Sequence, residues 1–247
     1  MLINSKSNIA NIAILGASGY TGAESIRLLM NNVNYKIINL TADSKAGNNI
    51  SEIFPHLRGI DLPKLMKVED LDFSKIDGIL SCLPHGKTQN ILAQIPKHIK
   101  ICDLSADFRF NDPNLYEKVY EKKHDAINLQ KEAVYGLTEI NRKKIIDARL
   151  IANPGCYPTS ALLPLIPLLN KGLISDENII IDSKSGVSGA GRMLKENLLF
   201  GEVSDGFTAY GLATHRHRPE IQTQLNYVCN SNIKVVFTPH LLPIKRG

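Results

Sequence analysis

IANIAIL at residues 9–15 runs directly into the glycine turn GASGYTG at residues 16–22. The first part is an apolar run of strand length, and a helical pattern over residues 23–30 follows the turn. Strand, glycine turn and helix in this order are the structural context of a dinucleotide-binding motif. The stretch therefore predicts an α/β fold whose first turn lies against a cofactor phosphate.

Each glycine of this turn has a separate expected role. Gly16 permits the tight turn, Gly19 lets the backbone approach a pyrophosphate, and Gly22 allows the helix to pack closely on the strand. The N–H groups at the helix start would then bind phosphate. The spacing is G-x-x-G-x-x-G rather than G-x-G-x-x-G, so a glycine-rich loop without a ligand is the alternative interpretation.

Polar residues after the second predicted strand, residues 35–41, bear on which dinucleotide is bound. Asp43 near the strand end favours NAD, because a carboxylate there binds the ribose 2′-hydroxyl. Ser44 and Lys45 could instead hold the 2′-phosphate of NADP. The local sequence leaves both open, and a solvated loop is the alternative for each of these residues.

Further strands at residues 77–83 and 99–104 flank a helical segment at residues 87–94, an alternation that favours a parallel sheet. Ligands of such sheets bind beyond the carboxyl ends of the strands, where the turn with His85 and the segment SADFR at residues 105–109 fall. Arg109 could clamp a carboxylate or phosphate. Pairing of Arg109 with a nearby aspartate is the alternative, and so is a merely solvated His85.

NPGCYPT at residues 153–159 places a cysteine between a glycine turn and a predicted helix start. A thiol there faces unpaired backbone N–H groups and the positive end of the helix dipole, which favours the nucleophilic thiolate. The bland alternative is a buried turn cysteine. Pro164 lies in the predicted helix, where it removes the hydrogen bond to the Ser160 carbonyl, so we expect a kink or a late helix start.

Two later segments carry polar groups. SGVSGAGR at residues 185–192 follows a strand at residues 178–184 and suits close approach to an anion or cofactor, with a flexible surface loop as the alternative. HRHRPEI at residues 215–221 begins a helix that runs to about residue 229, and a strand at residues 234–238 follows. Either histidine of this motif could be a general base or merely structural.

Composition excludes several classes of protein. Of 247 residues, 43% are hydrophobic, which supplies a sizeable core, and the net charge of +5 is scattered, so we expect no nucleic-acid partner. The four cysteines show no metal-ligand spacing, so we expect no metal. The first eight residues lack an apolar signal core, and the longest apolar run is too short to span a bilayer. We therefore expect a soluble cytoplasmic protein with reduced thiols and no membrane partner.

The motifs GASGYTG, LPHG, DLSADFR, YGLTE, NPGCYPT, SGVSGAGR and HRHRPEI occur in this order from residue 9 onward. Together they resemble the N-acetyl-gamma-glutamyl-phosphate reductase family of arginine biosynthesis. NPGCYPT and HRHRPEI are the specific parts, since GASGYTG is shared with aspartate-semialdehyde dehydrogenases. The resemblance implies a Rossmann-type NADP-binding domain at residues 1–152 and an α+β catalytic and dimerisation domain at residues 153–247.

The resemblance also implies the roles of individual residues. Cys156 is implied as the nucleophile and His217 as the acid/base. NADP is the implied cofactor, an acyl phosphate is the implied substrate, and a homodimer or homotetramer is the implied assembly. The implied cofactor contacts are Gly16, Ser18, Gly19, Tyr20, Thr21, Ser44, Lys45, Ser188 and Gly189, and the expected substrate contacts are Arg109, Arg192 and His215.

The expected reaction is NADPH-dependent reduction of N-acetylglutamyl 5-phosphate to N-acetylglutamate 5-semialdehyde through a cysteine thioester. Members of this family usually continue past the stretch that corresponds to residues 239–243, so the second domain is expected to be incomplete. Two alternatives follow: a truncated, non-catalytic chain that binds dinucleotide, or an aspartate-semialdehyde dehydrogenase. HRHRPEI argues against the second alternative.

Overall fold

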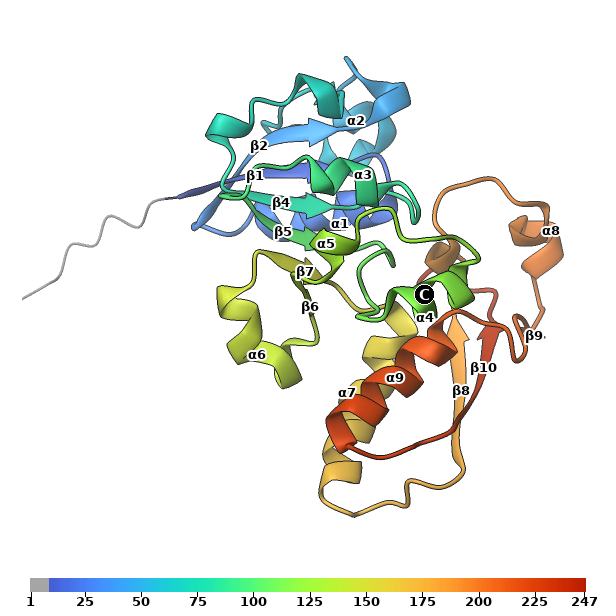
Figure 1. Ribbon diagram of the computed structural model, residues 1–247. Coiled ribbons are helices and arrows are strands. Elements are labelled where there is room, and N and C mark those ends of the chain that lie inside the picture. Colours follow the sequence, from blue (N-terminus) through green and yellow to red (C-terminus); the bar gives the residue numbers. More distant parts are fainter. Residues whose placement is uncertain (1–8) are drawn as a thin grey trace, which may run out of the picture. The chain divides into compact units, whose positions relative to one another are not determined.

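The structure, a computed structural model, describes residues 9–247. The first eight residues, in which the sequence shows no apolar signal core, lie outside the described residues. The chain divides into two compact units (Figure 1). Of the described residues, unit 1 comprises those up to Asn111 together with His124–Asn153, and unit 2 comprises Asp112–Lys123 and Pro154–Gly247. The assignment of residues 1–152 and 153–247 to a cofactor-binding and a catalytic domain stays a prediction.

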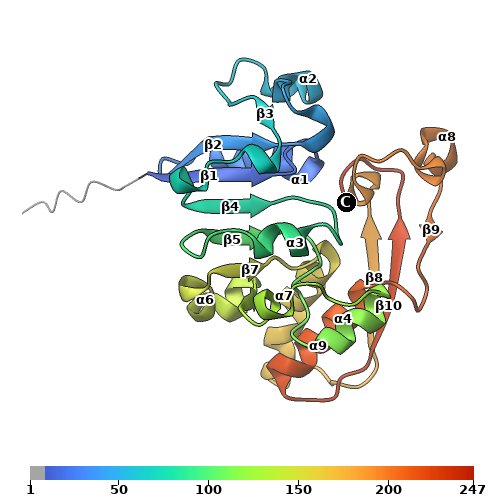
Figure 2. The ribbon, with the colours of Figure 1, turned by 45° about the horizontal axis from the view of Figure 1, so that its top comes forward.

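Unit 1 is built on a seven-stranded sheet in which every neighbouring pair of strands is parallel (Figure 2). The strand order is β3-β2-β1-β4-β5-β7-β6, so the direction of winding reverses between β1 and β4. This confirms the predicted parallel α/β fold. The strands are β1 (Ala10–Leu15), β2 (Tyr35–Thr41), β3 (Leu65–Met66), β4 (Gly78–Ser81), β5 (Lys100–Asp103), β6 (Ala133–Tyr135) and β7 (Leu150–Ala152).

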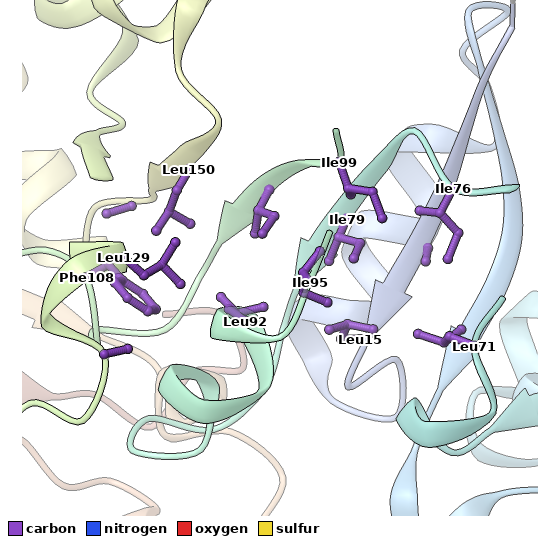
Figure 3. Close-up of a cluster of buried hydrophobic side chains, with 14 residues drawn as sticks. Leu15, Leu71, Ile76, Ile79, Leu92, Ile95, Ile99, Phe108, Leu129 and Leu150 are labelled. Carbon is purple, nitrogen blue, oxygen red and sulfur yellow. The ribbon is translucent and has the colours of Figure 1, made fainter. Parts of the chain in front are cut away.

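Helices cover both faces of this sheet. The side chains of β1 alternate between two buried clusters, with Ile12 and Ile14 on one face and Ala13 and Leu15 on the other. The first cluster includes residues of α1 (Tyr20–Leu29) and α2 (Ile50–Ile53). The second, shown in Figure 3, includes residues of α3 (Thr88–Ala93) and α5 (Ile127–Gln130). Burial on both faces explains why these strands have continuous apolar sequences.

Two details of unit 1 differ from the sequence-based expectation. Helix α1 begins at Tyr20 rather than at residue 23, so the third glycine of the turn lies inside the helix. Strands β3 and β6 were not predicted, because two or three residues are too few to show a periodic pattern. Helix α6 (Thr138–Asp147) begins within the YGLTE motif.

Unit 2 combines helices with a three-stranded sheet of order β8-β10-β9. Strand β10 (Val235–Leu241) is parallel to β8 (Ile179–Ser185) and antiparallel to β9 (Thr208–Ala209). Helices α7 (Cys156–Asn170) and α9 (His217–Cys229) lie side by side, and α9 contacts β10 (Figure 1). The remaining helices of the unit are α4 (Pro113–Tyr120) and α8 (Phe200–Val203).

Helix α7 corrects one prediction. A kink or a late helix start was expected because of Pro164. The late start is wrong, because the helix begins at Cys156 and continues through Pro164 and Pro167. Apolar side chains on its inner face, including Leu162 and Ile166, are buried. This burial offsets the two backbone hydrogen bonds that the prolines remove, so tertiary packing overrides local propensity.

Candidate functional site

Two glycines of the first turn are required by the packing of unit 1 itself. Gly16 has a φ of +72°, and a Cβ built on it would lie 2.7 Å from the Cys82 carbonyl oxygen, just beyond β4. A Cβ on Gly22 would lie 2.6 Å from the Cα of Ala17. The tight turn at Gly16 and the close packing at Gly22 therefore agree with the sequence interpretation. Both lie where the sheet reverses its winding, the usual ligand-binding position in such folds.

Gly19 differs from its two neighbours, because packing within the chain does not demand a glycine there. A Cβ at this position would lie 3.6 Å from the Gly16 carbonyl oxygen, an ordinary contact. Gly19 is the N-cap of α1 and has no side chain to cap it, and the first turn of the helix contains no acidic residue. This helix start fits a phosphate that approaches the backbone closely. Ser18, Tyr20 and Thr21 lie in the same turn.

The residues expected to distinguish NADP from NAD lie at the end of β2. Asp43, Ser44 and Lys45 form a short 3₁₀ turn, and all three are exposed. Strand β2 is hydrogen-bonded to β1 in parallel, so this turn lies at the same edge of the sheet as the glycine turn. The side chains present there include both the carboxylate that suits a ribose hydroxyl and the ammonium that suits a phosphate.

The LPHG loop after β4 is held by a carboxylate that sequence reasoning had not singled out. The side chain of Asp107 is buried, and it accepts hydrogen bonds from the Gly86 N–H at 2.9 Å and from the Thr88 N–H at 3.3 Å. The Thr88 hydroxyl also donates to it, and His85 Nδ1 lies 2.6 Å from it. Burial alone would raise the pKa of Asp107, but the bonds from His85, Thr88 and Gly86 outweigh it and hold the pKa far below its usual range.

Arg109 is also buried, at 6% exposure. Its guanidinium donates hydrogen bonds to the carbonyl oxygens of Asn153, at 2.8 Å, and Leu104, at 3.1 Å. The Arg109 side chain therefore braces the chain at the residue where NPGCYPT begins. Its expected contact with substrate stays a prediction.

The cysteine turn belongs to unit 2 from Pro154 onward. Cys156 is the first residue of α7 and is exposed, and Gly155 is the N-cap. The Gly155 carbonyl accepts hydrogen bonds from the Thr159 N–H and hydroxyl, each at 2.9 Å. The Gly155 N–H donates to Glu220 Oε1 at 2.9 Å. The thiol thus lies at an exposed helix start, and the preceding residue, Gly155, is hydrogen-bonded through both its N–H and its carbonyl.

The two histidines of HRHRPEI lie together beside the same helix start. His217 is the first residue of α9 and is 7% exposed, and its N–H donates to His215 Nδ1 at 3.1 Å. The ring of Tyr157 contacts both imidazoles edge-on. Burial, with a smaller effect of the Arg216 charge, lowers the pKa of His215 to about 4, so this imidazole is neutral at pH 7.

A cavity of about 690 Å³ in unit 2 brings Cys156, His215 and His217 together. Gly189 of the SGVSGAGR loop also lines it, whereas Ser188 and Arg192 do not. Sequence reasoning missed four other lining residues, of which three lie outside the motifs and one lies between the two histidines of HRHRPEI. These are Lys195, Glu202, Tyr210 and Arg216.

Two absences hold for the described part of the chain. Within residues 9–247, no group of three or more His, Cys, Asp or Glu side chains is placed to hold a metal ion. Across the same residues, every helix is too short or too polar to cross a bilayer.

Comparison with known families matches most of the chain. Residues 11–148 match the family described as "Semialdehyde dehydrogenase, NAD binding domain", and residues 156–247 match "Semialdehyde dehydrogenase, dimerisation domain". Among solved structures, aspartate semialdehyde dehydrogenase II from Vibrio cholerae superposes with a TM-score of 0.67 at 15% identity. That alignment covers 95% of this chain and 71% of the other, and it shows the fold alone.

Curated relatives are more similar in sequence. A protein of Rhodospirillum rubrum named "N-acetyl-gamma-glutamyl-phosphate reductase" is 55% identical over 96% of this chain and 69% of its own length. A "Probable N-acetyl-gamma-glutamyl-phosphate reductase, chloroplastic" of Arabidopsis thaliana is also 55% identical over 96% of this chain. The chain spans 59% of the length of that relative and 57% of its counterpart in Oryza sativa subsp. japonica. The chain belongs to the semialdehyde dehydrogenase family, among the N-acetyl-gamma-glutamyl-phosphate reductases.

Proposed function

We propose that the chain carries the active-site residues of an NADPH-dependent reductase that converts N-acetylglutamyl 5-phosphate to N-acetylglutamate 5-semialdehyde in arginine biosynthesis. One observation carries this proposal: the exposed thiol of Cys156, at the start of α7, and the imidazole of His217, at the start of α9, line one cavity. The names of the relatives support the substrate.

The two residues divide the chemistry between them. His217 accepts the thiol proton as Cys156 Sγ attacks the acyl carbon, and it passes this proton to the phosphate as the C–O bond breaks. A reduced nicotinamide, when bound, supplies the hydride that reduces the resulting thioester carbon. The C–S bond then breaks to release the semialdehyde, and His217 relays one solvent proton back to the thiolate. N–H groups in the first turn of α7 stabilise the oxyanion, by roughly 3–4 kcal/mol per donor.

The remaining predicted residues are proposed as binding groups. Gly16, Gly19 and the side chains of the first turn hold the pyrophosphate, and Ser44 and Lys45 hold the 2′-phosphate that distinguishes NADP. Ser188 and Gly189 approach the nicotinamide end. Substrate contacts are proposed for Arg109, Arg192 and His215, and assembly as a homodimer or homotetramer is proposed from the matched dimerisation domain.

Assay of the reverse reaction tests this function. Purified chain is given N-acetylglutamate semialdehyde, phosphate and NADP, and we expect phosphate-dependent formation of NADPH. Cys156→Ala should lower turnover at least about 1,000-fold, because no other group replaces the nucleophile. Cys229→Ala, at the far end of α9, is the matched control and should leave turnover unchanged.

Three outcomes would contradict the proposal. Comparable turnover in Cys156→Ala would remove the thioester mechanism. Faster turnover of aspartate semialdehyde on the same preparation would assign the other semialdehyde as substrate. Thermal stabilisation by NADPH without any turnover would leave only a dinucleotide-binding protein.

A further inference from the structure

A buried carboxylate connects the two helices that carry the proposed catalytic groups. Glu220 lies in the first turn of α9 and is 0% exposed. Its Oε1 accepts the hydrogen bond of the Gly155 N–H at 2.9 Å, across 65 residues of sequence. Burying a carboxylate costs free energy that an apolar side chain would not cost, and hydrogen bonds such as the one from Gly155 offset this cost.

The residue it holds is the one immediately before the nucleophile. Gly155 is bonded through its N–H to Glu220 and through its carbonyl to the N–H and hydroxyl of Thr159. Both peptide planes around Gly155 are therefore fixed. Because Cys156 is the next residue and starts α7, the direction of its Cα–Cβ bond is fixed with them.

Glu220 also follows the proposed acid/base by three positions on the same helix. Residues at i and i+3 lie on one helix face, about 4.5 Å apart along the axis. A single rigid turn of α9 thus carries both His217 and the carboxylate that anchors the nucleophile's turn. The bond further commits the Gly155 N–H to Glu220, so that only later N–H groups of α7 can face a reacting carbonyl oxygen.

We propose that Glu220 is a positioning residue that fixes Cys156 relative to His217 through its hydrogen bond to the Gly155 N–H. This inference rests on the proposed roles of those two residues. It requires an oxygen acceptor at position 220 rather than a negative charge, because the contact is a bond to a neutral peptide N–H.

The test compares two replacements of Glu220. Glu220→Gln keeps an oxygen acceptor of the same reach, whereas Glu220→Met fills a similar volume without one. Gln224→Ala is the matched control, since Gln224 is a buried polar residue one turn further along α9. Each variant is treated with iodoacetamide between pH 5 and 9, and the alkylation rate of the peptide that contains Cys156 is measured by mass spectrometry beside kcat, KM and the melting temperature.

Glu220→Met should lower kcat at least about 100-fold with KM within about 3-fold, and should change the pH profile of Cys156 alkylation. Glu220→Gln should recover kcat to within about 5-fold of the parent. Gln224→Ala should lower the melting temperature without altering the alkylation profile. If Glu220→Met does not fold, Thr159→Val removes the hydroxyl bond to the Gly155 carbonyl and should lower kcat several-fold.

Two results would overturn the proposal. The first is a Glu220→Met or Thr159→Val variant whose kcat and alkylation profile match those of Gln224→Ala at an equal melting temperature, which would make the role merely structural. The second is a Glu220→Gln variant as impaired as Glu220→Met, which would show that charge and not the hydrogen bond matters. Both results can be recognised from the alkylation profile even if the parent shows no turnover. Failure of the proposed function is therefore distinguished from failure of this proposal.

Discussion

Two helices of unit 1 begin at the same edge of the sheet, after the neighbouring strands β1 and β4, and different groups face the N–H groups at their starts. At the start of α3, the Asp107 carboxylate accepts the N–H groups of Gly86 and Thr88. At the start of α1, the N-cap is Gly19, which has no side chain to accept such a bond, and the first turn contains no acidic residue. Backbone N–H groups at a helix start therefore hold the LPHG loop at α3, and they fit a ligand's anion at α1.

Asp107→Asn weakens the hydrogen bonds at the start of α3, and it should have the largest effect of all the variants on the free energy of unfolding. An asparagine keeps one oxygen but not the charge that binds His85, so we expect a loss of about 3–4 kcal/mol in the free energy of unfolding at pH 7. The pKa of Asp107 is depressed, so its contribution is present above the unfolded pKa of about 3.9 and is lost as pH falls through the folded pKa. The difference from the parent should therefore shrink in strong acid.

Urea unfolding at pH 7 and pH 3 measures this difference. Asp72→Asn is the control, because Asp72 also accepts a backbone N–H, from Ser74, but is exposed. Its substitution should change stability by less than about 0.5 kcal/mol. Equal stabilities of Asp107→Asn and the parent would mean that the carboxylate does not hold the α3 start.

Asp103 sharpens the comparison, because it lies in the same polar network with the opposite pKa shift. Ser105 Oγ donates to Asp103 and contacts the Thr88 hydroxyl at 3.0 Å, which in turn donates to Asp107. Burial raises the pKa of Asp103 to about 6. A carboxyl with a raised folded pKa stabilises the fold below the unfolded pKa, and this stabilisation is lost as pH rises through about 6.

Asp103→Asn should remove that pH dependence. A shift of about 2 pKa units corresponds to about 3 kcal/mol, so the variant should lose less stability than the parent between pH 4 and pH 7 by about that amount. Urea unfolding at half-unit intervals of pH measures the slope. Parallel pH curves for the two proteins would show that Asp103 is ionised normally and that Asp107 alone accounts for the network.

Sequence alone predicted those parts of the fold that depend on local pattern. The glycines at positions 16 and 22 predicted sites where the backbone packs too closely for a side chain. The continuous apolar runs predicted strands that are buried on both faces. The family resemblance carried by NPGCYPT and HRHRPEI likewise implied that Cys156 and His217 belong to one site, and both line the cavity of unit 2. Their chemical roles stay predictions.

The remainder depends on contacts that only folding creates. Nothing in the local sequence around Glu220 shows that it accepts the Gly155 N–H, because Gly155 lies 65 residues away. Asp107 is similar, since the loop it holds precedes it by about 20 residues and shows no acceptor motif of its own. The late start expected for helix α7 was wrong for the same reason. The packing that stabilises this helix despite its prolines comes from other parts of unit 2, such as α9.

Gly19→Asp tests the start of α1, because it gives this helix a carboxylate near its first N–H groups, as Asp107 does at α3. A side chain fits at Gly19, and aspartate is a favoured N-cap, so stability should stay within about 1 kcal/mol of the parent. The new charge would occupy and repel the anion-binding position, so NADPH affinity should fall at least about 100-fold, or about 2.7 kcal/mol.

Fluorescence titration with NADPH measures this affinity, and Gly19→Ala separates size from charge. The alanine variant should lose much less affinity for NADPH. Its methyl group adds bulk, but it accepts no hydrogen bond from the N–H groups of α1 and carries no charge. Unchanged NADPH affinity in Gly19→Asp would contradict the assignment of this helix start to the pyrophosphate. A loss that is equal in both variants would show instead that close backbone approach, and not the helix-start charge, is what the dinucleotide requires at this turn.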